Sequence, residues 1–580
     1  MTRGQRALLL GGGLVVLAVG GILLAGAATK DFVQGVHVVK ACVGLAAAGF
    51  YFYELSRDNQ RRPIAERWKK LVMITLGVLS IALYFNAFKL GYEKWYHRHD
   101  QYHYYMGAKY FPELGYDWLY RCTVIAEDEL GKVTDDKGRV FDLKAEARHG
   151  DRKVRDLGAT NLLIPAAQVL EEPGICKDHF APERWEAFKT DVKYFRLEAN
   201  KEYWHGMQKD HGYNPPPVWT LFGRFWAALS PASVKFQIVL ASLDVFFNLG
   251  MLAAVAWAFG WRAFAVAAIL WGCEGAADPY YWTGGAFLRQ DWLFFSVLAA
   301  CLSRKKYHAL AAASMVQAAL LRVFPGVLVM GWLVLAGWHL VRHKRFAPTH
   351  LRMLLGGTIA TVVLVGASLV WVGKDSYKAF YEHTIVVHDR TPLTNHMGLR
   401  VVIAHKWGSG QKSGRMEHTK DDKLVDPFQL WKDMRVARYD KYKWIGYLWM
   451  AATMAAFVWV LRRVRTPWVA QALSVVWIIL MAQLTNYYYG FLVCAVPLIK
   501  VRRDLELAFY GYVFVTQMVW LKAYWNDDKY TLQTYAALIL SYLLIAAFWD
   551  KKKQRAQPAS DTPRDPTKAE IGDSSRSHTP

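Results

Sequence analysis

The sequence predicts an all-α polytopic membrane protein with about fourteen transmembrane helices and two long extracytoplasmic loops. Hydrophobic residues make up 54% of the 580 positions, they recur in blocks, and lysine and arginine gather between the blocks. The mean hydropathy is only +0.07 because two long polar stretches dilute the blocks. In a soluble protein the net charge of +23 would suggest nucleic acid. Cations confined to short connectors are topology signals instead, so we expect no nucleic-acid partner.

The apolar blocks predict the helices in chain order. The predicted helices lie at 7–28, 36–55, 71–90, 236–258, 262–275, 291–302, 307–323, 326–341, 351–373, 443–461, 467–484, 489–499, 505–524 and 532–549. A full crossing needs about 17 to 25 residues. Some blocks, such as 262–275 and 291–302, are shorter, which indicates helices that are tilted, broken or buried within the bundle.

The positive charges predict the orientation. With the N-terminus inside, every even-numbered connector is cytoplasmic, and these connectors hold the Lys and Arg clusters at 57–70, 304–306, 342–345, 462–465 and 500–503, with a further cluster at 551–555. The short connectors assigned outside hold few cations. We therefore expect a multi-pass protein of the inner (plasma) membrane, with both termini cytoplasmic and the polar stretches facing outward.

These signals divide the chain into six regions: N-terminal helices at 1–90, a long extracytoplasmic loop with an amphipathic helix at 91–235, a central bundle at 236–373, a second outer loop at 374–442, C-terminal helices at 443–550 and a disordered cytoplasmic tail at 551–580. The first helix follows Arg3 and Arg6 and ends in small residues, so a cleaved signal peptide is an alternative. Its removal would start the next helix on the wrong side of the membrane.

Asp100 is the candidate general base. It lies in a run of His, Arg and Tyr residues at 97–105, a few positions beyond an apolar stretch. A carboxylate in such a setting is suited to accept a proton from a hydroxyl. The alternative is an ordinary loop carboxylate paired with Arg98 or Lys109.

The histidines of this run are also candidate metal ligands. His97, His99 and His103 alternate with Tyr and Arg, a spacing that equally fits an aromatic belt at the membrane interface. The chain contains no CxxC or HExxH spacing.

Two of the six cysteines, Cys122 and Cys176, lie in the first outer loop. In an oxidising compartment they form a candidate disulfide, and the sequence leaves their proximity open. The other four lie in predicted helices, where a buried thiol is the simpler reading.

Five short motifs follow Asp100 at predicted outer positions. They are YNPPPVWTL at 213–221, GGAFLRQDW at 284–292, LLRVFP at 320–325, TPLTNHMGLR at 391–400 and TNYYY at 485–489. Consecutive prolines force an extended segment and then an abrupt helix start.

In this order, the motifs resemble those of the GT-C superfamily of integral membrane glycosyltransferases, nearest to the polyprenyl-phosphate-mannose-dependent mannosyltransferases. The resemblance spans about 95–490, and the Pro-Pro and Arg-x-Phe-Pro elements are its most specific parts. The chain departs from the family pattern at 288–291, which reads Leu-Arg-Gln-Asp instead of Gly-Gln-aliphatic-Asn. It also has Arg322 where lysine is common, and an unusually long first loop. The sugar and the acceptor therefore stay open.

The resemblance implies transfer of a sugar, with a mannose-like hexose favoured, from a polyprenyl-phosphate donor to a lipid or glycan acceptor at the extracytoplasmic face. Such a transfer needs a base for the acceptor hydroxyl and cations for the departing phosphate. The expected base is Asp100. The expected donor-phosphate ligands are Arg322, Arg289 and Arg400. Because most branches of this superfamily that use lipid-monophosphate donors need no metal, the resemblance also implies no metal and no cofactor. The expected sugar or acceptor contacts are Gln290, Asp291, Asn395, Tyr102 and Tyr487.

Several alternatives remain open. Arg322 is otherwise a snorkelling arginine at the interface, and Arg289 otherwise pairs with a neighbouring acid. A secondary transporter is a different class of protein, but internal repeats are not evident. A non-enzymatic membrane assembly protein would tolerate Asp100→Asn.

Overall fold

The structure is a computed structural model that describes residues 32–88, 94–158, 161–277, 284–407 and 429–549. The predicted first helix at 7–28 and the tail at 551–580 lie outside the described residues. Helical structure occupies the positions of the other predicted helices within these ranges. The protein is therefore predominantly helical.

Within the described residues, six helices are long and apolar enough to cross a membrane. These candidate spans are Phe32–Asn59, Val234–Phe259, Phe324–His343, Pro348–Trp371, Trp431–Leu461 and Asn526–Ala547. Other apolar helices are shorter: α15 (Trp261–Cys273) has 13 residues, and α17 (Asp291–Arg304) and α18 (His308–Leu321) have 14 each. At 1.5 Å per residue, 14 residues reach only about 21 Å, less than the hydrocarbon core of a bilayer.

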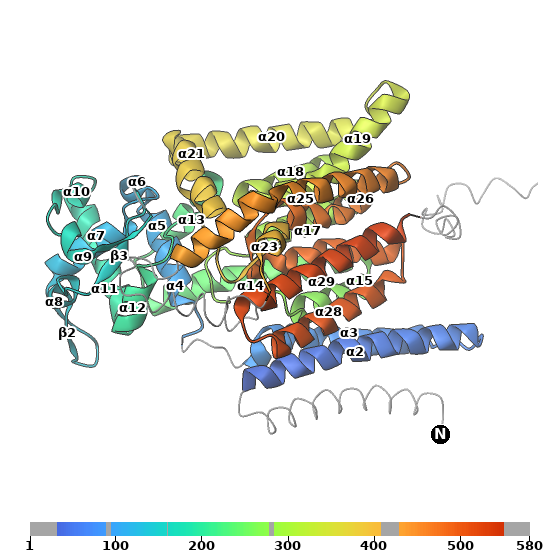
Figure 1. Cartoon of the computed structure of the whole chain (residues 1–580), viewed down its shortest axis with the longest axis horizontal. Coiled ribbons are helices and arrows are strands. Elements are labelled where there is room, and N and C mark those ends of the chain that lie inside the picture. Colours follow the sequence, from blue (N-terminus) through green and yellow to red (C-terminus); the bar gives the residue numbers. More distant parts are fainter. Residues whose placement is uncertain (1–31, 89–93, 159–160, 278–283, 408–428, 550–580) are drawn as a thin grey trace, which may run out of the picture.

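The helices run side by side along the long axis of the molecule (Figure 1). The remaining bundle elements are α2 (Phe32–Asn59), α3 (Glu66–Tyr84), η1 (Asn86–Phe88), α14 (Val234–Phe259), η3 (Phe324–Val329), α19 (Met330–His343), α20 (Pro348–Trp371), α25 (Gln429–Leu461), α26 (Pro467–Leu473), α27 (Val475–Met481), η5 (Asn486–Lys500), α28 (Leu505–Lys522) and α29 (Asn526–Ala547). Helix α17 packs between α14 and α18, and α18 packs on α20. The short helices are thus enclosed by longer ones.

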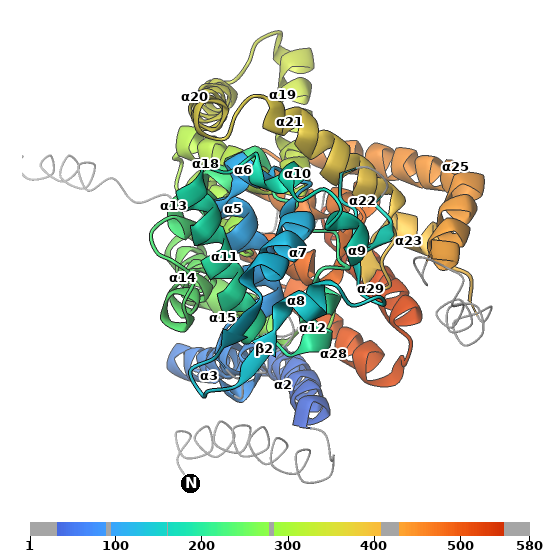
Figure 2. The ribbon, with the colours of Figure 1, turned by 90° about the vertical axis from the view of Figure 1, so that its left-hand side faces the viewer.

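The predicted first outer loop is a folded lobe at one end of the bundle (Figure 1, left). Its helices are α4 (Arg98–Gln101), η2 (Tyr102–Met106), α5 (Gly107–Lys109), α6 (Phe111–Leu114), α7 (Leu119–Leu130), α8 (Leu143–Ala147), α9 (Ala166–Val169), α10 (Gly174–Lys177), α11 (Pro182–Leu197), α12 (Lys201–Met207) and α13 (Pro217–Ala227). Two antiparallel pairs complete the lobe: β1 (Lys132–Thr134) with β2 (Val140–Asp142), and β3 (Lys153–Arg155) with β4 (Leu163–Pro165). Figure 2 looks onto this lobe, which lies in front of the bundle.

Covalent and ionic links hold the lobe together. A disulfide joins Cys122 of α7 to Cys176 of α10, with Cα atoms 5.4 Å apart. Glu127, also on α7, is fully buried, pairs with Arg152, and accepts a 2.8 Å hydrogen bond from Nε1 of Trp204. A buried charge is tolerated when its partners satisfy it in this way. The lobe is thus a packed unit that can hold side chains in fixed positions.

The segment predicted as the second outer loop also reaches the bundle. It contains α21 (Asp375–Phe380), η4 (Tyr381–Val386), α22 (Val387–Arg390), β5 (His396–Met397) and α23 (Leu399–Ala404). Strand β5 pairs with β6 (Leu484–Thr485), with His396 opposite Thr485. This pairing places the 391–400 motif beside the 485–489 motif.

Candidate functional site

Asp100 lies on a helical stretch that begins with α4 and continues through a π-helical turn, η2. The ring of His97 caps the start of α4 by accepting a 3.1 Å hydrogen bond from the backbone N–H of Asp100. Residues four apart share a helix face, whereas residues two apart do not. Tyr104 therefore lies on the same side as Asp100, and Tyr102 points elsewhere.

Tyr102 belongs to the core of the lobe. Its side chain is completely buried, its hydroxyl is 2.8 Å from that of Thr123, and its ring centroid is 4.9 Å from that of Trp204. The structure thus does not bring Tyr102 to the neighbourhood where we expected a sugar or acceptor contact. Tyr104 is the tyrosine of this run that faces the other candidate residues.

The turn at 284–290 lies against the start of α4 because Gly285 allows a close approach. The backbone N–H of His97 donates a 2.9 Å hydrogen bond to the carbonyl of Gly285. Gly285 has a φ of +72°, and a Cβ atom there would lie 2.7 Å from the Cα of Tyr96. Only glycine combines this backbone conformation with this contact.

This approach brings Arg289 to Asp100. The two side chains form a buried ion pair, and the residues Arg289 and Asp100 are 8% and 2% exposed. The backbone N–H of Phe287 also lies 3.3 Å from Oδ2 of Asp100. Burial raises the pKa of the Asp100 carboxyl, but Arg289, His97 and His99 outweigh it and leave the pKa below the ordinary value of 3.8. The carboxylate is therefore ionised at neutral pH.

Asp244 of α14 holds the same turn from the bundle side. Its two carboxylate oxygens accept hydrogen bonds of 3.0 and 2.9 Å from the backbone N–H groups of Arg289 and Gln290. Sequence reasoning missed this residue. The sequence nevertheless contained a signal for it: Asp244 is an acid inside the apolar block at 236–258. An acid in such a block rarely lacks a charged partner or a functional role.

Arg322 is the second buried arginine of the site. It follows α18 directly and is 6% exposed. Its guanidinium carbon lies 5.7 Å from the ring centroid of Tyr104 and 5.5 Å from that of Trp219. Nη1 donates a 3.1 Å hydrogen bond to the carbonyl of Leu321, but Nε and Nη2 have no hydrogen-bond partner in the described part of the chain. Unsatisfied buried donors of a cation are suited to an anionic ligand.

Two tyrosines of the 485–489 motif connect the arginines. The guanidinium carbon of Arg289 lies 4.6 Å from the ring centroid of Tyr487, whose ring is 4.6 Å from that of Tyr488. Three tyrosines interact electrostatically with both Arg289 and Arg322, namely Tyr104, Tyr487 and Tyr488. We call the following residues the Asp100 cluster: Asp100, Tyr104, Trp219, Arg289, Arg322, Tyr487 and Tyr488.

Helix α13 attaches this cluster to the proline motif. Pro217 is its first residue, and the preceding Pro216 is extended, as the consecutive prolines predict. Nε1 of Trp219 donates a 2.9 Å hydrogen bond to the carbonyl of Leu288, within the 284–290 turn. The indole therefore ties the lobe to the turn that holds Arg289.

Gln290 and Asp291 border the cluster, where the chain enters α17. Both side chains are buried, at 8% and 3% exposed. Asp291 accepts a 2.8 Å hydrogen bond from the backbone N–H of Trp292 and is an electrostatic neighbour of Arg322. The predicted residues of the 284–292 motif thus lie together.

Asn395 and Arg400 have different positions. Nδ2 of Asn395 donates a 3.3 Å hydrogen bond to Oδ1 of Asn486, the residue before Tyr487. Arg400 pairs with Asp389 and lies 4.3 Å from the ring centroid of Tyr439. Asn395 thus contacts the residue that precedes a member of the cluster. No hydrogen bond, ion pair or ring contact among the described residues joins Arg400 to the cluster.

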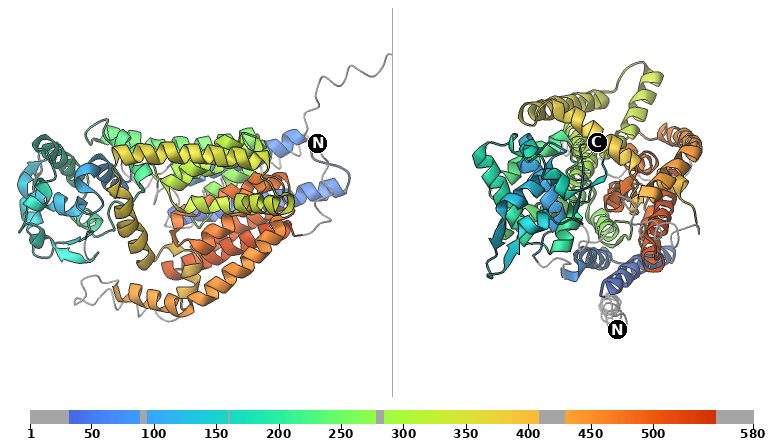
Figure 3. Two further views of the ribbon diagram at one scale, coloured as in Figure 1. Left: turned by 90° about the horizontal axis from the view of Figure 1, so that it is seen from above. Right: turned by 60° about the vertical axis from the view of Figure 1, so that its left-hand side comes forward.

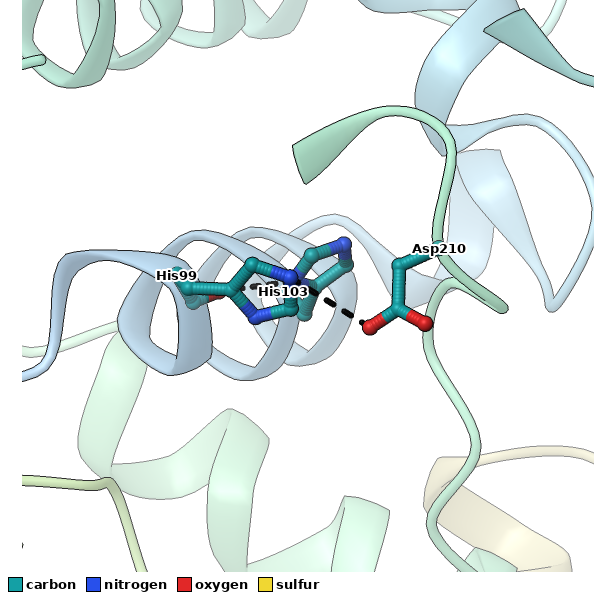
Figure 4. A group of neighbouring side chains, drawn as sticks. All are labelled: His99, His103 and Asp210. Carbon is teal, nitrogen blue, oxygen red and sulfur yellow. Dashed lines mark hydrogen bonds and ion pairs between the residues drawn. The ribbon is translucent and has the colours of Figure 1, made fainter. Parts of the chain in front are cut away.

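His99, His103 and Asp210 form the one group of potential metal ligands found among the described residues (Figure 4). Their ligand atoms lie within 4.8 Å of one another, and Nε2 of His99 is 3.3 Å from the Asp210 carboxylate. His103 uses both ring nitrogens, one 2.6 Å from the His99 carbonyl and the other 2.6 Å from the Tyr120 hydroxyl. Burial, aided by His99, lowers the pKa of His103 to about 4. A metal bound to His103 would have to displace either the His99 carbonyl or the Tyr120 hydroxyl, so we assign these residues a structural role.

The fold and the site define a predominantly helical membrane protein with a buried cluster of charges and aromatic rings between its helix bundle and its lobe. No protein-family model, no curated protein and no solved structure matches the chain.

Proposed function

We propose that the protein is a GT-C-type membrane glycosyltransferase that moves a hexose, with a mannose-like sugar favoured, from a polyprenyl-phosphate donor to an acceptor hydroxyl. The observation that supports this proposal is the pairing of Asp100 with Arg289, which lies 189 positions further along the chain. Tyr104, Tyr487 and Tyr488 interact electrostatically with both Arg289 and Arg322, which links the second arginine to this pair. Transfer of a sugar from a phosphate needs a base for the acceptor hydroxyl and cations for the departing phosphate, and a carboxylate with two arginines provides both.

The proposal includes an orientation in the plasma membrane. The lobe would face the extracytoplasmic side, both termini the cytoplasm, and the chain would cross about fourteen times. Its support is the arrangement of the connectors: those joining α2 to α3, α19 to α20 and α25 to α26 lie at the end of the molecule away from the lobe (Figure 1). These connectors contain the basic clusters at 57–70, 342–345 and 462–465.

In the proposed reaction the donor phosphate binds Arg322. The Nε and Nη2 donors of this residue form one edge of the guanidinium fork, which matches two phosphate oxygens. The acceptor oxygen forms a bond to the anomeric carbon of the sugar while the bond from that carbon to the phosphate oxygen breaks. The hydroxyl proton passes to Asp100, and the polyprenyl phosphate leaves with its charge held by arginine.

Arg289 has two partners in this scheme. In the structure it pairs with Asp100. A bound phosphate would compete for the guanidinium, and weaker pairing would raise the pKa of Asp100 and make the carboxylate a better proton acceptor. Donor binding would thereby activate the base.

Aromatic and polar groups complete the proposed site. Tyr104 and Tyr487 offer ring faces suited to a sugar ring, since such faces are apolar and pack on C–H groups. Gln290 and Asp291 lie next in the chain to Arg289 and offer hydrogen-bonding groups for the sugar or the acceptor.

The test is sugar transfer by purified full-length protein in liposomes, with radiolabelled polyprenyl-phosphate mannose and matched donors for other sugars. We expect Asp100→Asn to lower turnover about 100-fold or more. The control Asp128→Asn removes a carboxylate that pairs with exposed Arg148 in the lobe, and it should keep normal turnover. Normal turnover by Asp100→Asn would exclude Asp100 as the base. Inactivity with every lipid-linked donor, together with substrate uptake into the liposomes, would identify a transporter instead.

A further inference from the structure

A second site is found at the opposite end of the bundle. A cavity of about 760 Å³ lies where the connectors between α17 and α18, α19 and α20, and α25 and α26 meet. Seen from above, the helices extend from the lobe toward this end (Figure 3, left). The cavity is therefore remote from the Asp100 cluster.

The charge of this cavity is positive. Its wall contains five lysine or arginine residues: Arg304, Lys306, Arg342, Arg462 and Arg465. None of the described residues that line it is an aspartate or a glutamate. Like charges gathered in one cavity repel each other, and a bound anion relieves this repulsion.

Histidines provide further hydrogen-bonding groups in the same cavity. The ring of His339 lies 4.4 Å from that of His343 and 5.7 Å from that of His350, measured between centroids. The Nδ1 atoms of His308 and His350 are buried and have no hydrogen-bond partner among the described residues. A ligand with acceptor oxygens would satisfy such atoms, because an imidazole nitrogen that bears a proton is a donor.

The surroundings of the cavity are apolar. Helix α20 begins at its edge, and Leu351, Leu354 and Leu355 in the first turns of this helix are 49%, 64% and 61% exposed. Trp338 and Trp468 lie in the cavity wall. An anion that binds here with attached hydrocarbon chains would place those chains on the exposed leucines.

We propose that this basic cavity binds the phosphate headgroup of an anionic phospholipid, with its acyl chains along α20. In the proposed orientation the lipid comes from the cytoplasmic leaflet, where anionic headgroups meet basic pockets between helix ends. A single phosphodiester carries one negative charge, whereas the cavity wall has five cationic side chains. A lipid with two phosphates is therefore expected to bind more tightly than a lipid with one.

The test is lipid binding by the full-length protein in detergent, measured by native mass spectrometry. The probes are diphosphatidylglycerol, phosphatidylglycerol and zwitterionic phosphatidylcholine. We expect retention of the two anionic lipids and not of phosphatidylcholine. The double variant Arg342→Gln/Arg465→Gln is expected to weaken diphosphatidylglycerol binding about 30-fold, from two phosphate-facing charges. The matched control Lys344→Gln/Arg345→Gln also removes two charges, both from the α19–α20 connector at positions outside the cavity wall, and it should bind normally.

Equal binding of phosphatidylcholine, or equal weakening by both double variants, would overturn the proposal. So would full displacement of the lipid by inorganic phosphate at equal concentration, because the site would then select a soluble anion. Size-exclusion profiles that match the wild type show that the variants are folded. The measurement does not use glycosyl transfer, so its failure and that of the proposed activity are separate results.

Discussion

Replacing Arg289 by glutamine is expected to leave Asp100 as a buried carboxylate without its guanidinium partner. Exposed ion pairs contribute only about 0–1 kcal/mol, whereas breaking a buried pair costs about 3–5 kcal/mol. Asp100 is 2% exposed and Arg289 is 8% exposed, so the larger range applies. The Phe287 N–H and the His97 ring remain near the carboxylate. We therefore expect a destabilisation near the lower limit, about 3 kcal/mol.

The assay is a double-mutant cycle with Arg289→Gln, Asp100→Asn and the combined variant, measured as thermal unfolding of the purified protein in detergent. Each single variant leaves one buried partner unmatched, and the double variant leaves neither charge. The loss in the double variant should therefore be clearly smaller than the sum of the single losses.

The pH dependence provides a second readout. The folded protein holds the pKa of Asp100 below its ordinary value of 3.8, so the contribution of the pair is present above that pH and is lost as the pH falls through the folded pKa. In Arg289→Gln, burial dominates and raises this pKa. The acid limb of the pH–activity profile should then move to higher pH than in the wild type. Strictly additive thermal shifts and an unmoved acid limb would refute the coupling.

Three further outcomes are expected. Arg322→Gln should lower kcat about 100- to 1000-fold by removing a phosphate ligand, and a loss confined to the KM of the acceptor would contradict that role. Gly285→Ala should lower the unfolding temperature and abolish transfer, because the substitution is strained at a φ of +72°; Gly206→Ala, whose added Cβ meets nothing within 4 Å, should change neither. Cys122→Ser/Cys176→Ser should destabilise the lobe by about 2–4 kcal/mol, and a reductant should destabilise the wild type but not this variant.

Much of the helical layout follows from composition alone. The apolar blocks predict where helices lie, because a helix is the structure that satisfies its own backbone hydrogen bonds in an apolar environment. The structure of the predicted first outer loop was harder to predict. Its polar sequence indicates a loop, but it folds as a lobe because buried pairs such as Glu127 with Arg152 form between residues far apart in the chain. Periodicity within a short window does not report such pairs.

The candidate site, too, was predictable from the sequence only in part. The motifs at 284–292 and 320–325 indicate Arg289 and Arg322 as ligands, and both are buried beside shared tyrosines. Sequence spacing did not distinguish Tyr102 from Tyr104, because both lie in one aromatic run and only the helix face separates them. Arg400 belongs to a motif that reaches the site through Asn395, yet its own side chain pairs with Asp389.

The sequence by itself determined the predominantly helical, apolar character of the protein, the positions of most helices and the residue types available for chemistry, since hydrophobicity and charge act locally along the chain. Only the tertiary structure decided which of those residues meet. Asp100 reaches Arg289 because Gly285 lets two backbones approach, Asp244 holds the turn from another helix, and α13 ties the lobe to it through Trp219. Contacts between distant segments depend on how helices pack, and that information is spread over the whole chain.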